Sequence, residues 1–148
     1  MTDTTPPSDS TYEHALSTAE QLLGFRLQPF LEDSGSEPPN AADFKRILTE
    51  HAFADSWPRT QFIDVRTRAL VSVTTTAVLG LHEPLRGQLR IALRSGVTPE
   101  EIVEAFIHIG VYAGVARAFD SYSIAAEVFA EFVAPDDTRR PQPKCHVA

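Results

Sequence analysis

A histidine and a tyrosine in the second half of the chain are well suited to acid and base chemistry. His108 and Tyr112 lie at an i, i+4 spacing, so on a helix both side chains project from one face. An imidazole changes charge near neutral pH and a phenol hydroxyl can donate to an oxyanion, so the pair could move protons. Gly110 and Gly114 leave room for a ligand or a neighbouring helix. The alternative is a core histidine bonded to a backbone carbonyl, with Tyr112 packed beside it and its hydroxyl tied to a loop.

A row of three arginines offers a place for a carboxylate. Arg86, Arg90 and Arg94 follow one another along one side of a predicted helix. A guanidinium holds a carboxylate through two parallel hydrogen bonds. The alternative is a solvated or intersubunit charged face. The threonines at 74–76 leave a similar choice between a polar ligand wall and side chains bonded to their own helix backbone.

Cysteine chemistry has little support in the composition. The 148 residues include one cysteine, Cys145, in a proline-rich C-terminal segment. One cysteine can form neither an internal disulfide nor a paired redox or zinc motif. His146 stands next to it as a possible base, but adjacent residues in such a segment have no scaffold to hold them.

The charge balance narrows the class of partner. The net charge of -7 argues against nucleic acid, which needs a basic face, and against anionic membranes. No apolar run reaches the length of a membrane span. The first ten residues carry neither a basic start nor an apolar stretch, so we expect no secretory signal and a cytoplasmic protein.

The first part of the chain predicts one helix between irregular segments. Residues 1–10, rich in Thr, Ser, Asp and Pro, predict a disordered tail. Apolar residues at helical spacing then predict a helix from Thr11, with Gly24 as its C-terminal cap. Proline, serine and glycine predict a loop over 29–39.

A second helix is predicted after Asn40, which is expected to cap it. It ends before Trp57, because the residue before a proline avoids helical geometry. Its apolar stripe comprises Phe44, Ile47, Leu48 and His51/Ala52.

The second half predicts four further helices. Asp64 caps a helix to about Leu79, which Gly80 stops. Thr98 and Glu101 form a capping box with Pro99 between them. The remaining predicted spans are 83–95, from Thr98 to about 114, and 116–133, whose expected buried face is Ala118, Tyr122, Ala125, Val128 and Phe129.

These segments make an all-α domain of about six helices. The β-branched run at 71–76 could form a strand, but the apolar pattern continues on both sides without a hairpin turn. We expect an N-terminal helix and loop over 11–39, a helical domain over 40–133 and a disordered tail over 134–148.

Four stretches resemble the carboxymuconolactone decarboxylase family. They are FADSW at 53–57, DVRTRALVSV at 64–73, LGLHEPLRGQLRIALRSGVTPEEI at 79–102 and HIGVYAGVARAFDSYSIAAEVFAE at 108–131. The resemblance implies an alkylhydroperoxidase D-like helical subunit, a small-molecule substrate and no cofactor. It also implies a homo-oligomer, a trimer or hexamer, with pockets near subunit contacts.

The resemblance separates the branches of this superfamily. The peroxidase branch uses a glutamate and then C-x-x-C-x-x-x-H, and the matching positions here are Ala69, Leu81, Pro84 and Gln88. A thiol peroxidase needs an attacking and a resolving thiol, so that activity is disfavoured unless Cys145 reaches a neighbouring subunit's pocket. The decarboxylase branch also usually has histidine where this chain has Gln88, and an amide cannot move a proton near neutral pH.

The resemblance also implies which residues form the site. The family commonly has histidine at His108, which we expect to act as acid and base, with Tyr112 as a hydrogen-bond donor. Gln88 is expected to face the pocket, and Arg86 or Arg117 to anchor a carboxylate. Arg117 stands where the family usually has a small residue. His82 either replaces the missing histidine or starts a solvated helix.

Two functions follow as hypotheses. The first is a cofactor-independent lyase or isomerase acting on a small lactone or an enolisable carboxylic acid. The second is a non-catalytic oligomeric binding or scaffolding protein of the same fold.

Overall fold

A computed structural model describes residues 9–133 of the chain. Within that range every regular element is a helix and no strand occurs, which confirms the all-α prediction, including the run at 71–76. None of these helices is long and apolar enough to cross a membrane. Both predicted tails fall outside the range except for Asp9 and Ser10, which already belong to the first helix.

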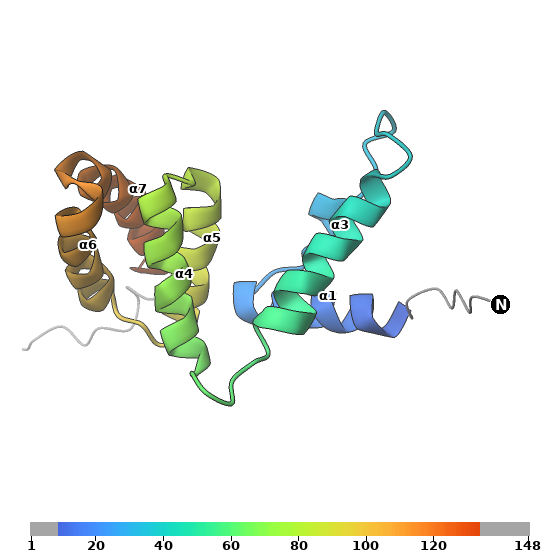
Figure 1. The fold of residues 1–148 in the computed structure, drawn as a ribbon, viewed down its shortest axis with the longest axis horizontal. Helices are drawn as coiled ribbons and strands as arrows, with labels where there is room; N and C mark the ends of the chain where they lie inside the picture. The colour runs from blue at the N-terminus through green and yellow to red at the C-terminus, as the bar shows by residue number, and fades with distance from the viewer. Residues whose placement is uncertain (1–8, 134–148) are drawn as a thin grey trace, which may run out of the picture.

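The N-terminal helices stand to one side of the rest (Figure 1). They are α1 (Asp9–Leu23), the short α2 (Gln28–Leu31), α3 (Ala41–Glu50) and a π-helical turn, η1 (His51–Ser56), that continues α3. Arg94 ties α1 to the rest, because its Nε donates to the carbonyl of Leu22 at 3.2 Å.

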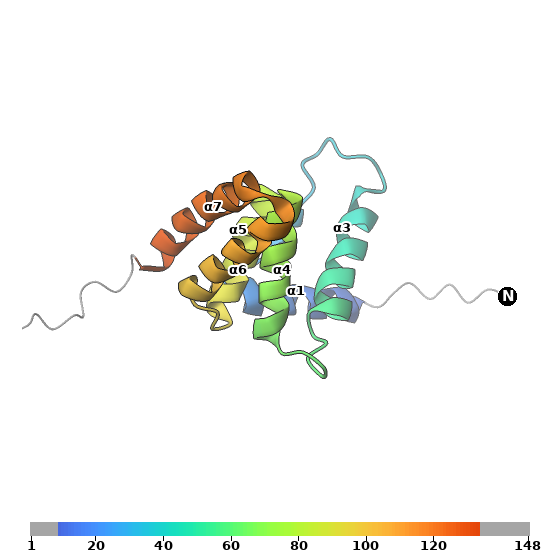
Figure 2. The same cartoon turned by 60° about the vertical axis from the view of Figure 1, so that its left-hand side comes forward.

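The four helices of the second half of the chain form the bundle that contains most of the core. They are α4 (Val65–Leu79), α5 (His82–Arg94), α6 (Pro99–Ala113) and α7 (Val115–Val133). Figure 2 shows them packed around one another, with the N-terminal helices outside. The largest fully buried side chains are Leu85, Leu89, Ile91, Ile102, Val73 and Val128.

Capping residues that the sequence predicts determine where α4 and α6 begin. The Asp64 carboxylate accepts the backbone N–H of Thr67 at 2.7 Å. The Thr98 hydroxyl accepts the N–H of Glu101, whose carboxylate accepts the N–H of Thr98 in return. Arg66 pairs with Glu101 and also donates to the carbonyl of Gly96, so it joins the start of α4 to the start of α6.

Several predicted details were wrong. The first helix begins at Asp9 rather than Thr11, and the predicted loop over 29–39 contains most of α2. Asn40 precedes α3 but makes no capping bond. On the predicted buried face of α7, Ala125 and Val128 are buried and Phe129 packs against the core, but Tyr122 is 48% exposed. The other buried residues of this helix are Ser121 and Ile124.

The predicted apolar stripe of the second helix is exposed in the single chain. Phe44, Ile47 and Leu48 on α3 are 64%, 51% and 49% exposed. The helix was located correctly, but its apolar face has no neighbour among residues 9–133 that buries it. The same holds for part of α6 and α7, where Ile107 and Phe119 are 63% and 69% exposed.

Candidate functional site

A histidine and an aspartate meet at the end of the bundle where α4 finishes and α5 begins. His82 is the first residue of α5, and its Nε2 lies 2.6 Å from Oδ2 of Asp120 on α7. The two side chains are 52% and 48% exposed. The carboxylate therefore orients the imidazole, whose other ring nitrogen, Nδ1, remains for a ligand.

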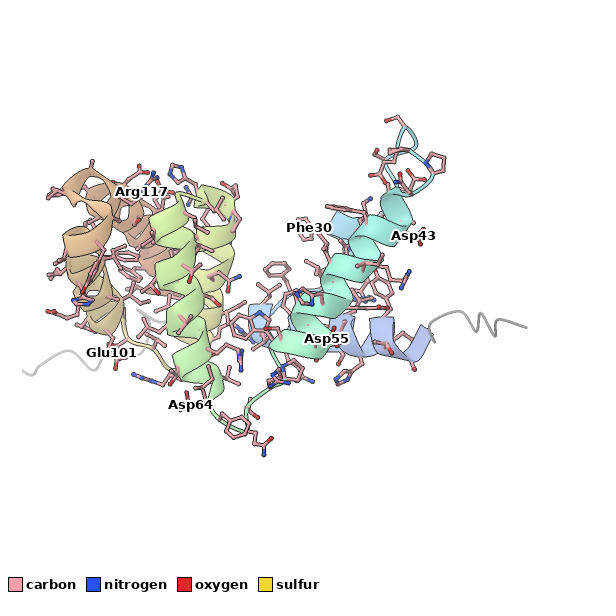
Figure 3. The ribbon with its side chains drawn as sticks, viewed as in Figure 1. Phe30, Asp43, Asp55, Asp64, Glu101 and Arg117 are labelled. Atoms are coloured by element: carbon pink, nitrogen blue, oxygen red, sulfur yellow. The ribbon has the colours of Figure 1, made fainter. Side chains whose placement is uncertain are left out.

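Arg117 lies one turn before Asp120 on α7, close to the end of α4 (Figure 3). Its guanidinium lies against Gly80, where an added Cβ would meet Nη1 at 2.1 Å. Gly80 also has a φ of +69°, the left-handed conformation that ends α4. Glycine therefore serves two purposes here, because it terminates the helix and leaves the space that the arginine occupies.

A hollow of about 430 Å³ opens beside these residues. Its walls are Ala113, Ala116, Arg117 and Asp120. The alanines leave it wide, and Arg117 makes no ion pair within the described chain. The Asp120 carboxylate and the unpaired Arg117 guanidinium thus border one open space, and the His82 imidazole contacts that carboxylate. A guanidinium can bind an acid, and an oriented imidazole can transfer a proton.

The backbone at this end is held in place by a buried hydroxyl. Ser121 is 2% exposed, and its Oγ donates to the carbonyl of Arg117 at 2.8 Å. This bond fixes the first turns of α7, which carry Arg117 and Asp120.

His108 and Tyr112 share a face of α6, as their spacing predicts. Their rings meet edge to face with centroids 5.4 Å apart. His108 is exposed and Tyr112 is 79% exposed, which excludes the core-histidine interpretation within this chain. Tyr112 directly precedes Ala113, a wall of the hollow beside Arg117. The catalytic role of this pair stays a prediction.

Gln88 is not one of the residues that line that hollow. Its Oε1 is enclosed and has no hydrogen-bond partner within the described residues. Ala69, which matches the glutamate of the peroxidase branch, is completely buried. At two positions that carry reactive groups in that branch, this chain therefore has the amide of Gln88 and the methyl group of Ala69. Substrate contact by Gln88 stays a prediction.

The arginine row on α5 is engaged in structural contacts. Arg86 pairs with Glu127 and Glu83, and the hydrogen bond that it donates to Glu127 is the main cause that raises the pKa of this guanidinium. Arg90 pairs with Glu131 on α7. A substrate carboxylate at Arg86 would have to displace Glu127, so that predicted role gains no support from the geometry.

The threonines on α4 are bonded to their own helix. Thr74, Thr75 and Thr76 each donate to a carbonyl in the preceding turn. This is the second of the two interpretations that the sequence left open.

Sequence reasoning missed Asp120. In the sequence it is an ordinary acidic residue on a helix, and it lies far along the chain from His82. Only the packing of α7 against α5 brings the two together, so no local pattern indicates the pair.

Comparisons with known proteins agree with the helical architecture. The sequence model described as carboxymuconolactone decarboxylase family matches residues 42–127. The 4-carboxymuconolactone decarboxylase of Acinetobacter baylyi is 30% identical over 66% of this chain and 73% of its own length. The nitrosuccinic acid decarboxylase npaB of Metarhizium robertsii is 28% identical over 70% of this chain and 74% of its own.

Proposed function

Since the chain belongs to the carboxymuconolactone decarboxylase family, we propose that it is a decarboxylase of small carboxylic acids that uses His82, Asp120 and Arg117. The names of both relatives describe acids with an electron-accepting group, a lactone in one and a nitro group in the other. We infer the same substrate class here. It comprises acids in which a carbonyl or nitro group can take up the electron pair left when CO2 departs.

The reaction needs one bond to break and one proton to arrive. The carbon–carbon bond to the leaving carboxylate breaks, its electron pair moves into the acceptor group, and CO2 departs. The resulting oxyanion-bearing intermediate then takes a proton on carbon, so each turnover consumes one proton. No electrons enter or leave the substrate, and no cofactor is part of this proposal.

Three side chains divide this work. Arg117 holds a carboxylate of the substrate that does not leave, and its charge also favours the developing oxyanion. His82 delivers the proton from Nδ1, while Asp120 receives the hydrogen bond from Nε2–H and keeps the ring oriented. The observation that carries the proposal is the 2.6 Å contact between His82 and Asp120 beside an unpaired arginine on an open hollow.

His108 and Tyr112 provide a second possible proton carrier. Their exposure and their contact at 5.4 Å support it, as does the position of Tyr112 next to Ala113. No carboxylate orients His108 within the described residues, which is why we favour His82.

We also propose that the protein is a homo-oligomer, a trimer or hexamer. The exposed apolar faces of α3, α6 and α7 support this, because monomeric proteins rarely leave such large apolar surfaces in water. A groove of about 200 Å³ between α6 and α7 is lined almost entirely by apolar side chains. Light scattering on the purified chain should give a multiple of 16.3 kDa.

The alternative is a scaffolding protein without catalysis. Ala69 and Gln88 support it, because both lack the groups that relatives use for chemistry. A thiol peroxidase is the least favoured function, and Cys145 lies outside the described residues.

Turnover in heavy water tests the proposal directly. The protein is incubated with 4-carboxymuconolactone, nitrosuccinate and, as a control, succinate, which has no electron-accepting group at the carbon. We expect CO2 from at least one of the first two acids, with one deuterium on the carbon that lost it. Absence of CO2 above the uncatalysed rate for both would favour the scaffolding alternative.

A further inference from the structure

A second cavity lies at the opposite end of α4 from Arg117. The loop between η1 and α4 curls around a space of about 540 Å³, which residues 58–63 and Arg68 line. Figure 3 shows Asp64, at the start of α4, at the far end of the bundle from Arg117. The 15 residues of α4 separate the two ends by about 22 Å. Within one chain this cavity is therefore distinct from the hollow beside His82.

Two arginines border this cavity without a carboxylate partner. Arg68 Nη2 donates to the carbonyl of Arg59 at 2.5 Å, which holds the loop against α4. Neither Arg59 nor Arg68 makes an ion pair within residues 9–133, whereas Arg66, two positions from Arg68, pairs with Glu101. Arg59 in the loop and Arg68 on α4 thus lack the counter-charge that Arg66 has.

Part of the Arg68 guanidinium is buried and unsatisfied. Its Nε is enclosed and has no hydrogen-bond partner among residues 9–133. A charged group withdrawn from water is unfavourable unless an opposite charge balances it. The nearest acid along the chain, Asp64, is already engaged as the cap of α4 through the N–H of Thr67. No carboxylate among the described residues therefore pairs with the Arg68 guanidinium, and a bound carboxylate would balance its charge.

Part of the cavity wall is apolar, beside the polar side chains of Thr60 and Gln61. Phe62 is 83% exposed and Ile63 is 38% exposed, so an aromatic and an aliphatic side chain face solvent beside two cations. This combination suits a ligand that has a carboxylate at one end and an apolar body at the other. A fully hydrated anion such as phosphate would leave the apolar wall without a function.

We propose that the loop at 58–63 and Arg68 form a binding site for an organic carboxylate. Arg59 and Arg68 hold the carboxylate, and Phe62 and Ile63 pack against the body of the ligand. This site is separate from the proposed decarboxylation site, and the proposal does not depend on decarboxylase activity.

Trp57 reports directly on this site. It is the single tryptophan of the chain, it is 7% exposed, and it immediately precedes the cavity wall at Pro58. The probe is 3-phenylpropanoate, followed by Trp57 fluorescence with excitation at the red edge of the indole band. Its control is 3-phenylpropanamide, which has the same shape without the charge.

We expect a saturable change in fluorescence with the acid and none with the amide. Arg59→Gln and Arg68→Lys should each weaken binding by about tenfold. The first variant loses a charged hydrogen bond to the carboxylate. The second keeps the charge but loses one of the two parallel hydrogen bonds that a guanidinium makes. Arg26→Gln is the matched control, since Arg26 is also exposed and makes no ion pair within the described chain. Its affinity for the acid should be unchanged.

Three results would overturn the proposal. They are the absence of saturable binding, an equal response to the amide, and unaltered affinity in Arg59→Gln. If Arg59→Gln instead lowers the oligomer mass while the wild type ignores the acid, an acidic side chain of a second copy occupies the cavity and the proposal is wrong.

Discussion

The guanidinium of Arg117 lies in the space that a side chain on residue 80 would enter. An added Cβ at Gly80 would come within 2.1 Å of Nη1, and the φ of +69° already disfavours any L side chain there. The end of α4 and the position of the proposed substrate anchor are thus coupled through one glycine.

Gly80→Ala should disturb both the fold and the site. We expect a loss of stability of about 1 kcal/mol from the left-handed backbone and a higher KM because Arg117 must move. Thermal unfolding and steady-state kinetics measure the two effects. The control is Gly87→Ala inside α5, where an added Cβ meets nothing within 4 Å, and which should gain about 0.5–1 kcal/mol. An unchanged KM in Gly80→Ala would argue against Arg117 as the anchor.

Arg117→Gln tests the anchor itself. Removing a charge that holds a non-leaving carboxylate should raise KM by about tenfold, with a smaller fall in kcat. Arg90→Gln is the matched control, because Arg90 on α5 already pairs with Glu131 on α7 and does not line the hollow. If the two variants behave alike, the substrate does not contact Arg117.

Asp120→Asn tests whether the carboxylate orients His82. The amide can keep a hydrogen bond to Nε2 but no longer selects the ring orientation that the proton transfer needs. We expect kcat to fall by roughly tenfold while KM stays near the wild-type value. Asp120→Glu should recover part of the lost kcat. An unaltered kcat in Asp120→Asn would mean that Asp120 does not orient His82 for the proton transfer.

The pH dependence of stability should reveal the Glu101 carboxylate. The N–H of Thr98 and then Arg66 hold its pKa below the ordinary value of 4.5. A depressed folded-state pKa stabilises the fold above the ordinary value, and this contribution disappears as pH falls through the lowered one. Glu101→Gln keeps a side chain that can close the capping box but cannot carry the charge.

The melting temperatures of wild type and Glu101→Gln should therefore differ most near neutral pH. The difference should shrink as pH drops below about 4.5, where the wild-type carboxylate takes up its proton. Glu100→Gln is a suitable control, because Glu100 makes no ion pair within the described residues. A constant difference down to strong acid would mean that the charge of Glu101 contributes nothing.

Much of the fold could be predicted because helix ends are local. Asp64, Gly80 and Thr98 act through bonds to residues a few positions away, so their sequence context suffices. Asn40 has an equally good context but makes no capping bond, since the chain enters α3 with a backbone geometry that does not present its side chain.

The site was harder to predict because it depends on packing between distant helices. His82 and Arg117 were each named as candidates from the resemblance, and their roles stay predictions, whereas Asp120 gave no signal before α7 was placed beside α5. The apolar stripe on α3 was predicted from the sequence, but its exposure in the single chain was not. A helical pattern shows that a face is apolar, whereas what covers that face depends on other parts of the assembly.

The measurement that tests the account most directly is the turnover of His82→Ala and His108→Ala side by side, with and without added imidazole. We predict that His82→Ala loses roughly 10² or more in kcat and that imidazole restores part of it, while His108→Ala keeps most of its activity. Full activity in His82→Ala, or imidazole rescue confined to His108→Ala, would contradict the account and move the proton transfer to α6.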